Sequence, residues 1–98
     1  DALKVGTANP QGWIAYSHYG LLFVKKSSYL EGETYLDRGA SHQIYCNQDV
    51  IELETLGPVT ELAPGQAVEH QEIWNVYPQG KWPEKILTIY EKARIAKS

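Results

Sequence analysis

Two glutamates lie inside an apolar, strand-like run of this chain, in the segment IELETLGP at residues 51–58. Because side chains alternate between the two faces of a strand, Glu52 and Glu54 share one face. A carboxylate on a face that lines a cleft can serve as a general base, whereas glutamates on a solvated face do no chemistry. These residues leave both interpretations open. The Gly-Pro pair at 57–58 ends the strand, so we expect Glu54 near a rim.

The histidines and the single cysteine are the other side chains that could carry chemistry. Their spacing matches no structural zinc pattern, and neither a P-loop nor a Gly-x-Gly-x-x-Gly loop is present to hold phosphates. The cysteine has no evident histidine partner that could lower its pKa and make it a nucleophile. We therefore expect neither a metal nor a cofactor on His18, His42, His70 and Cys46.

Aromatic residues are frequent for a small acidic domain, since the chain has seven tyrosines and three tryptophans among 98 residues. The apolar face of such a ring matches the C–H face of a pyranose, so this composition suits a sugar-binding surface. The alternative is that these side chains fill the interior of a β-sandwich, where aromatic residues are also favoured. Composition does not separate the two.

Aromatic and β-branched runs, separated by turn residues at short intervals, predict a single mainly β domain that is an antiparallel β-sandwich. Residues 1–11 are polar and broken by glycine and proline, which indicates an arm or loop with at most a short strand. The β region spans 12–78. We expect a hairpin of strands 12–16 and 21–29, a short strand or loop at 35–39, a second pair at 42–48 and 50–57, and a strand at 68–78.

The hydrophobic period changes near the end of the chain. Apolar residues there recur at three- and four-residue spacing, namely at Trp82, Ile86, Ile89, Tyr90, Ala93 and Ala96. This spacing predicts one C-terminal α-helix over 82–97, with Pro83 and Glu84 in its first turn. Its apolar stripe can face the core or dock a partner.

Charge and length restrict the function classes. The net charge is −3 and the basic residues are scattered, so no basic stripe exists to neutralise nucleic-acid phosphates. No apolar run reaches the roughly 20 residues of a membrane span. The lone Cys46 allows no internal disulfide, which favours a reducing compartment and hence the cytoplasm. Methionine is absent even from position 1, so either the initiator was removed or the chain is a piece of a longer protein.

Several motifs of the β region resemble the C-terminal part of the galactose mutarotase-like (aldose 1-epimerase-like) proteins. They are Leu-Glu-Thr at 53–55, Gly-Pro at 57–58, Leu-x-Pro-Gly at 62–65 and Val-x-His-x-Glu-x-Trp at 68–74. Upstream, the fitting residues are Gly12, Trp13, Phe23, Lys25, Tyr35, Asp37, Gly39, Ile44 and Tyr45. The resemblance therefore covers about residues 12–78.

This resemblance implies half of a β-supersandwich and a sugar or sugar-like ligand on a concave sheet. In the epimerases the glutamate of Leu-Glu-Thr is the base that takes the anomeric hydroxyl proton, which points to Glu54 as the catalytic residue here. The candidate ligand-binding residues are His70, Trp74 and Glu52, of which Glu52 lies outside the matched position. No histidine of this chain falls where the family places its acid, so no acid partner is assigned to Glu54.

The chain also departs from the family pattern, because Leu56 stands where a glutamine is usual and the full supersandwich is more than twice as long. We therefore expect a fragment of a longer chain, a half that completes its sheet as a homo-oligomer, or a relic that kept the fold without the chemistry. The leading interpretation is a carbohydrate-related protein that binds or epimerises a sugar. The alternative is a non-catalytic carbohydrate-binding or protein-interaction module that self-associates through its edge strands.

Overall fold

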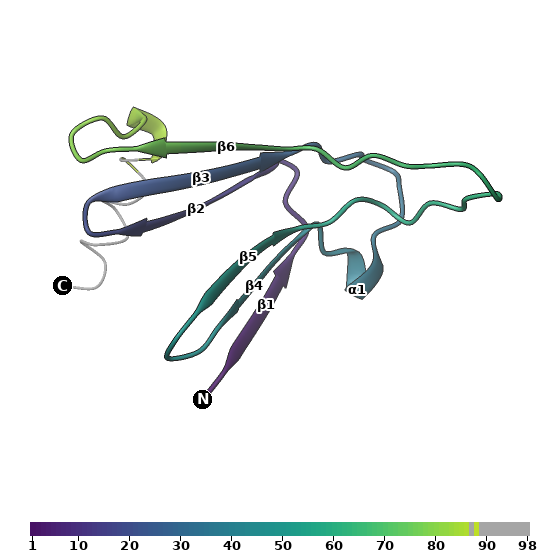
Figure 1. Cartoon of the computed structure of the whole chain (residues 1–98), viewed down its shortest axis with the longest axis horizontal. Helices are drawn as coiled ribbons and strands as arrows, with labels where there is room; N and C mark the ends of the chain where they lie inside the picture. The colour runs from purple at the N-terminus through teal and green to yellow at the C-terminus, as the bar shows by residue number, and fades with distance from the viewer. Residues whose placement is uncertain (87, 89–98) are drawn as a thin grey trace.

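A computed structural model describes residues 1–86 and 88, which form two three-stranded antiparallel sheets (Figure 1). Sheet A has the order β1-β4-β5 and sheet B has the order β2-β3-β6. The strands are β1 (Leu3–Thr7), β2 (Trp13–His18), β3 (Leu21–Ser27), β4 (His42–Cys46), β5 (Ile51–Thr55) and β6 (Glu72–Tyr77). The predicted mainly β, antiparallel sandwich-like fold is confirmed.

Both predicted hairpins are present, and local turn chemistry explains them. Tyr19 and Gly20 connect β2 to β3 with φ angles of 51° and 79°, the two positive values that a two-residue type I′ turn requires. Between β4 and β5, the side-chain oxygen of Asn47 accepts hydrogen bonds from the backbone amides of Asp49 and Val50, at 2.8 and 2.9 Å. Asparagine stabilises turns in this way.

The short strand that the prediction allowed within the arm is present: residues 3–7 form β1, which pairs with β4 along its whole length. Two other elements differ from the expectation. Residues 36–39 form a helical turn, α1 (Leu36–Gly39), instead of a strand or loop. This turn ends where Arg38 and Gly39 adopt φ angles of 62° and 85°, the left-handed conformation typical of helix C-termini. The strand predicted from residue 68 begins only at Glu72, because its partner β3 ends at Ser27, the residue that pairs with Glu72.

The predicted C-terminal helix over 82–97 is described in part. Residues 84–86 and 88 are helical, and the Thr88 hydroxyl donates to the Glu84 carbonyl at 2.9 Å. Residues 87 and 89–97 lie outside the described residues. Trp82 precedes the helical residues, and its indole N–H donates to the Gly20 carbonyl at 2.9 Å. This bond fastens the segment after β6 to the β2–β3 turn.

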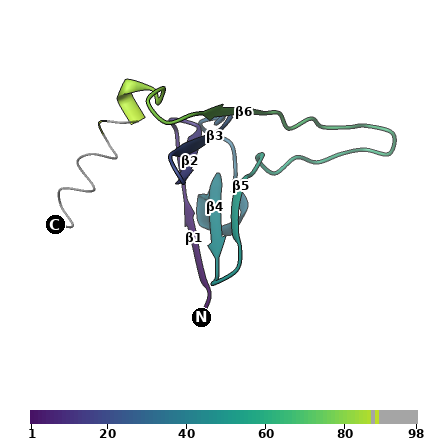
Figure 2. The same cartoon turned by 60° about the vertical axis from the view of Figure 1, so that its left-hand side comes forward.

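The two sheets meet at one end and diverge toward the other (Figure 1). Contacts between them run from Lys25 and Glu72 of sheet B to Leu53 and Thr55 of sheet A. We call the faces that turn toward each other the inner faces, and the opposite ones the outer faces. The long segment between β5 and β6 extends away from both sheets (Figure 2).

The buried core is small. Among the described residues, the buried hydrophobic side chains are those of Ile14, Leu22, Val24, Tyr35 and Ala40. Many large apolar side chains of the strands stay exposed, including Val5 of β1 and Trp74 and Val76 of β6. The core therefore sits around the central strand β3 and the segment of α1, and it covers only part of the apolar surface of the sheets.

Candidate ligand-binding site

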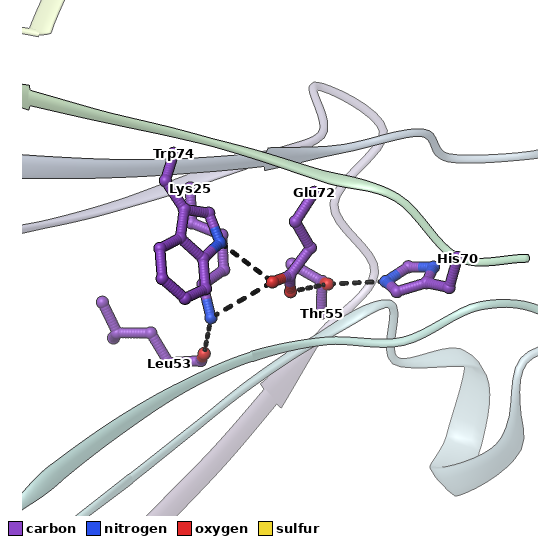
Figure 3. A network of polar contacts seen from close by, with 6 residues as sticks. All are labelled: Lys25, Leu53, Thr55, His70, Glu72 and Trp74. Atoms are coloured by element: carbon purple, nitrogen blue, oxygen red, sulfur yellow. Dashed lines mark hydrogen bonds and ion pairs between the residues drawn. The ribbon is translucent and has the colours of Figure 1, made fainter.

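A cluster of polar side chains gathers around Glu72 where the two sheets meet (Figure 3). The Trp74 indole N–H donates to Glu72 Oε1 at 2.9 Å, and Lys25 Nζ lies 3.6 Å from the same oxygen. The Thr55 hydroxyl donates to the other carboxylate oxygen, Oε2. One carboxylate thus binds groups from β3, β5 and its own strand.

Strand register brings these side chains together. In the ladder between β3 and β6, Lys25 pairs with Trp74 and Ser27 pairs with Glu72. Residues two apart on a strand point to the same face, so Lys25 and Glu72 are diagonal neighbours on the inner face of sheet B. Lys25 also donates to the Leu53 carbonyl at 2.7 Å and thereby reaches across to sheet A.

His70 adds an imidazole just before β6. Its Nε2 lies 2.7 Å from the Thr55 hydroxyl oxygen. A threonine hydroxyl has one proton, and here that proton goes to Glu72. His70 Nε2 must therefore carry the proton of its bond with Thr55 and act as its donor. In the neutral imidazole this leaves Nδ1 as a hydrogen-bond acceptor, on the side of Gly57.

The electrostatics keep Glu72 ionised. Burial by itself would raise the pKa of the Glu72 carboxyl. Hydrogen bonds from Thr55 and Trp74, together with the positive charge of Lys25, outweigh burial and hold the pKa below its ordinary value. Glu72 is therefore a carboxylate at neutral pH, consistent with its acceptance of hydrogen bonds from both Thr55 and Trp74.

His42 lies beside this cluster, because it pairs with Thr55 in the β4–β5 ladder. Its side chain is buried, with only 1% of the residue exposed. Burial lowers the pKa of His42, although the negative charge of Glu72 opposes this shift. His42 Nδ1 lies 3.1 Å from the Ser41 hydroxyl, and its Nε2 has no hydrogen-bond partner among the described residues. A neutral imidazole is thus enclosed at the junction of the sheets.

Trp74 presents an aromatic surface next to the charged groups. The residue is 63% exposed although its N–H is bonded to Glu72. Lys25 Nζ lies 5.2 Å from the indole centroid, and the Phe23 ring meets the indole edge-on at 5.6 Å. These contacts hold the ring on β6 while much of it remains open to solvent.

The structure brings together two of the four residues selected from the sequence. His70 and Trp74 both join the cluster, through Thr55 and Glu72. Glu52 and Glu54 precede Thr55 by three residues and by one residue, so their side chains point to the opposite face of β5. They therefore lie on the outer face of sheet A, away from the cluster. In the β4–β5 ladder Glu54 pairs with Gln43 and Glu52 pairs with Tyr45.

The sequence analysis did not select Glu72, the central residue of the cluster, as a site residue. It did not select Lys25 or Thr55 either. The spacing His-x-Glu-x-Trp at 70–74 is a signal that could have identified Glu72, because it predicts one shared strand face. Lys25 and Thr55 carry no such signal, since they come from strands distant in sequence.

A groove of about 880 Å³ adjoins the cluster at His70. Its walls come mainly from the two arms of the segment between β5 and β6, at residues 57–61 and 68–71. Ser28, Leu30 and Glu33 complete the lining. His70 therefore faces the cluster with one ring nitrogen and borders an open groove with the rest of its side chain.

Within the described part of the chain, no group of three or more histidine, cysteine, aspartate or glutamate side chains is placed to hold a metal ion. No helix among these residues is long and apolar enough to cross a membrane. No protein-family model, curated protein or solved structure matches this chain.

Proposed function

We propose that the chain is a non-catalytic carbohydrate-binding module whose ligand stacks on Trp74 and bonds to the polar cluster. The observation that supports this most is the exposed Trp74 indole, fixed at its N–H by the carboxylate of Glu72. An exposed, oriented aromatic ring suits the C–H face of a sugar. Neighbouring charged groups suit sugar hydroxyls, which both donate and accept hydrogen bonds.

The cluster supplies complementary polar groups within one region. Glu72 has about four lone-pair sites on its two carboxylate oxygens, so it can accept from a ligand besides its present donors. Lys25 offers an ammonium group beside the ring, at 5.2 Å from its centroid. His70 Nδ1, the acceptor of the neutral imidazole, is placed at the groove beside the cluster.

Binding is favoured over epimerisation because of where Glu54 lies. An epimerase needs a base and an acid on the same ligand. Glu54, the base that the mutarotase resemblance implies, is on the outer face of sheet A, whereas His70 and His42 lie on the inner side with Thr55. Epimerisation with Glu54 as the base would require an acid from outside the described residues. The exposed edge strand β6 supports the self-associating version of the module.

Titration with a panel of free hexoses and uronates, followed through the indole N–H resonances by NMR, tests the proposal. We expect selective shifts of the Trp74 resonance and, in Trp74→Ala, a loss of affinity on the order of tenfold. Ile73→Ala is the matched control, because Ile73 is 62% exposed on the opposite face of the same strand. Absence of binding by every sugar, or equal losses in both variants, would contradict the proposal.

The same samples separate binding from catalysis. Anomer exchange should run at its buffer rate in the presence of the parent chain, and Glu54→Gln should leave sugar affinity unchanged. Acceleration of anomer exchange that disappears in Glu54→Gln would instead establish Glu54 as a general base and make the chain an epimerase.

A further inference from the structure

Strand β6 is an edge of sheet B along which no other described strand pairs. It is one of the two outer strands in the order β2-β3-β6, and its sequence EIWNVY contains no lysine, proline or glycine. The other outer strand, β2, also lacks these residues, but only one of its six residues is exposed, against three of six in β6. Ile73, Trp74 and Val76 are 62%, 63% and 62% exposed. Natural proteins usually blunt such an edge with charge, proline or a bulge, because its free N–H and C=O groups are a template for another strand.

The edges of sheet A carry the protection that β6 lacks. β1 contains Lys4 and Gly6, and β5 contains Glu52 and Glu54. The one charged residue of β6 is Glu72, whose carboxylate is already engaged by Lys25, Thr55 and Trp74 within the same chain. The β6 strand of a second copy can therefore pair with this edge without burying an unpaired charge.

The chain also exposes more surface than a compact protein of its mass. Its accessible surface is 7715 Å², whereas a compact monomer of 11.1 kDa exposes about 5,700 Å². The excess exceeds the roughly 800 Å² per partner that a standard protein–protein interface buries. Enough surface is thus available for a stable dimer.

We propose that β6 pairs antiparallel with β6 of a second copy of this chain, with Asn75 at the two-fold axis. Directly opposed residues of a continuous sheet share a face, so the two-fold axis must pass through a residue position of β6. In the register centred on Asn75, Trp74 of each copy lies opposite Val76 of the other, and Ile73 of each copy lies opposite Tyr77 of the other. Aromatic residues opposite β-branched ones are favoured cross-strand pairs.

The neighbouring register is less favourable. Centred on Trp74, it would pair the two tryptophans but place Glu72 opposite Val76 and Ile73 opposite Asn75, which sets polar groups against apolar ones on both faces. The Asn75 register confines such a mismatch to Glu72 and Pro78, beyond the end of β6, and keeps the two Glu72 carboxylates further apart. It would join two copies of sheet B into one six-stranded sheet with both Trp74 side chains on the same face. The self-complementary pairing selects a second copy rather than an unrelated peptide.

This inference deepens the self-association part of the proposed module, and it is tested without any sugar. In a Cys46→Ser background, Asn75→Cys places two thiols on directly opposed residues, whose Cα atoms lie about 4.5–5.5 Å apart and within reach of a disulfide. Ile73→Cys on the same face is the control, because its two thiols would be offset by four residues, about 13 Å. We expect covalent dimers of Asn75→Cys to form at least about tenfold faster under mild oxidation.

Circular dichroism checks that both variants keep their strand content, and sedimentation equilibrium of the parent chain measures association directly. A concentration-dependent dimer together with selective crosslinking at position 75 supports the proposal. A parent chain that stays monomeric up to millimolar concentration, or equal crosslinking of the two variants, would overturn it. Neither result depends on whether Trp74 binds a sugar, so failure here and failure of the sugar-binding function are distinguishable.

Discussion

At the scale of single residues, Glu72 links the two sheets through one carboxylate. Lys25 from β3, Thr55 from β5 and Trp74 from β6 itself all contact it. Lys25 and Glu72 expose only 13% and 23% of their side chains, so their attraction is screened less than that of a surface pair. Removal of the Glu72 charge would leave the partly buried Lys25 ammonium without its counter-ion, and an uncompensated buried charge destabilises the folded state.

The free energy of unfolding should fall in two steps as the pH decreases. The pKa of His42 in the folded chain is below 6.5 because burial penalises the imidazolium. Its contribution to the free energy of unfolding is therefore fully present above pH 6.5 and is lost as the pH falls from 6.5 to the pKa of the folded chain. The pKa of Glu72 is below 4.5, since burial is outweighed by its hydrogen bonds and Lys25. Its contribution is present above pH 4.5 and is lost as the pH falls through the folded pKa. In both windows the unfolded chain binds more protons.

Urea unfolding across this pH range measures both steps. Glu72→Gln should cost about 1–3 kcal/mol at neutral pH, with a deficit that shrinks below pH 4.5. Glu52→Gln on the exposed outer face should change stability by less than about 0.5 kcal/mol. His42→Leu should remove the step that begins near pH 6.5. A parent chain whose stability is flat between pH 6.5 and 4.5 would contradict the account of His42.

At the scale of elements, Gly12 ends the connection between β1 of sheet A and β2 of sheet B. Gly12 precedes β2 with a φ of 79°, and its carbonyl accepts the Ser27 amide at 2.8 Å. Its own amide bonds to the Asn9 carbonyl at 3.0 Å. A Cβ added at Gly12 would lie 2.5 Å from the Ser27 carbonyl oxygen, which belongs to the backbone and cannot rotate away.

Gly12→Ala should therefore be more destabilising than an alanine at another glycine with positive φ. Gly65 has a φ of 85° and nothing within 4 Å of an added Cβ, so Gly65→Ala shares the conformational strain without the collision. We expect about 1–2 kcal/mol for Gly65→Ala and a further 1–3 kcal/mol for Gly12→Ala. Chemical denaturation of the two variants compares these costs. Equal losses would show that the close approach of Gly12 to Ser27 is relieved by movement of the backbone.

At the scale of the whole molecule, the divergence of the sheets leaves apolar surface uncovered. Unfolding would expose a surface of about 16,100 Å² for a chain of this mass, against 7715 Å² in the folded chain. The folded chain thus buries about 8,400 Å², whereas a compact fold would bury about 10,400 Å². Less hydrophobic stabilisation is available than length alone would suggest.

The dependence of unfolding free energy on urea should reflect this openness. Because the m-value scales with the surface exposed on unfolding, we expect it to be roughly a fifth smaller than for a compact protein of equal length. Measurement at micromolar concentration keeps association from adding buried surface. An m-value at or above that of compact proteins of this size would mean that the sheets close on each other in solution.

Local signals account for much of the fold. The turn residues Tyr19 and Gly20 and the Asn47 side chain define the two hairpins, because turn geometry depends on neighbours in sequence. Alternation also predicted that His70 and Trp74 share a face, and both reach the cluster. The strand character of residues 3–7 was underestimated, since this segment depends on pairing with β4, some 40 positions away.

The sequence by itself determined which residues share a strand face: Glu52 with Glu54, and His70 with Trp74. Only the tertiary structure decided which of those faces turns toward the other sheet. Alternation is a property of one strand, whereas the orientation of a strand follows from pairings between distant segments, such as β3 with β6. Those pairings set Glu72 against Thr55 and Lys25 and directed Glu54 away from them, because a side chain and its sequence neighbour cannot occupy the same face.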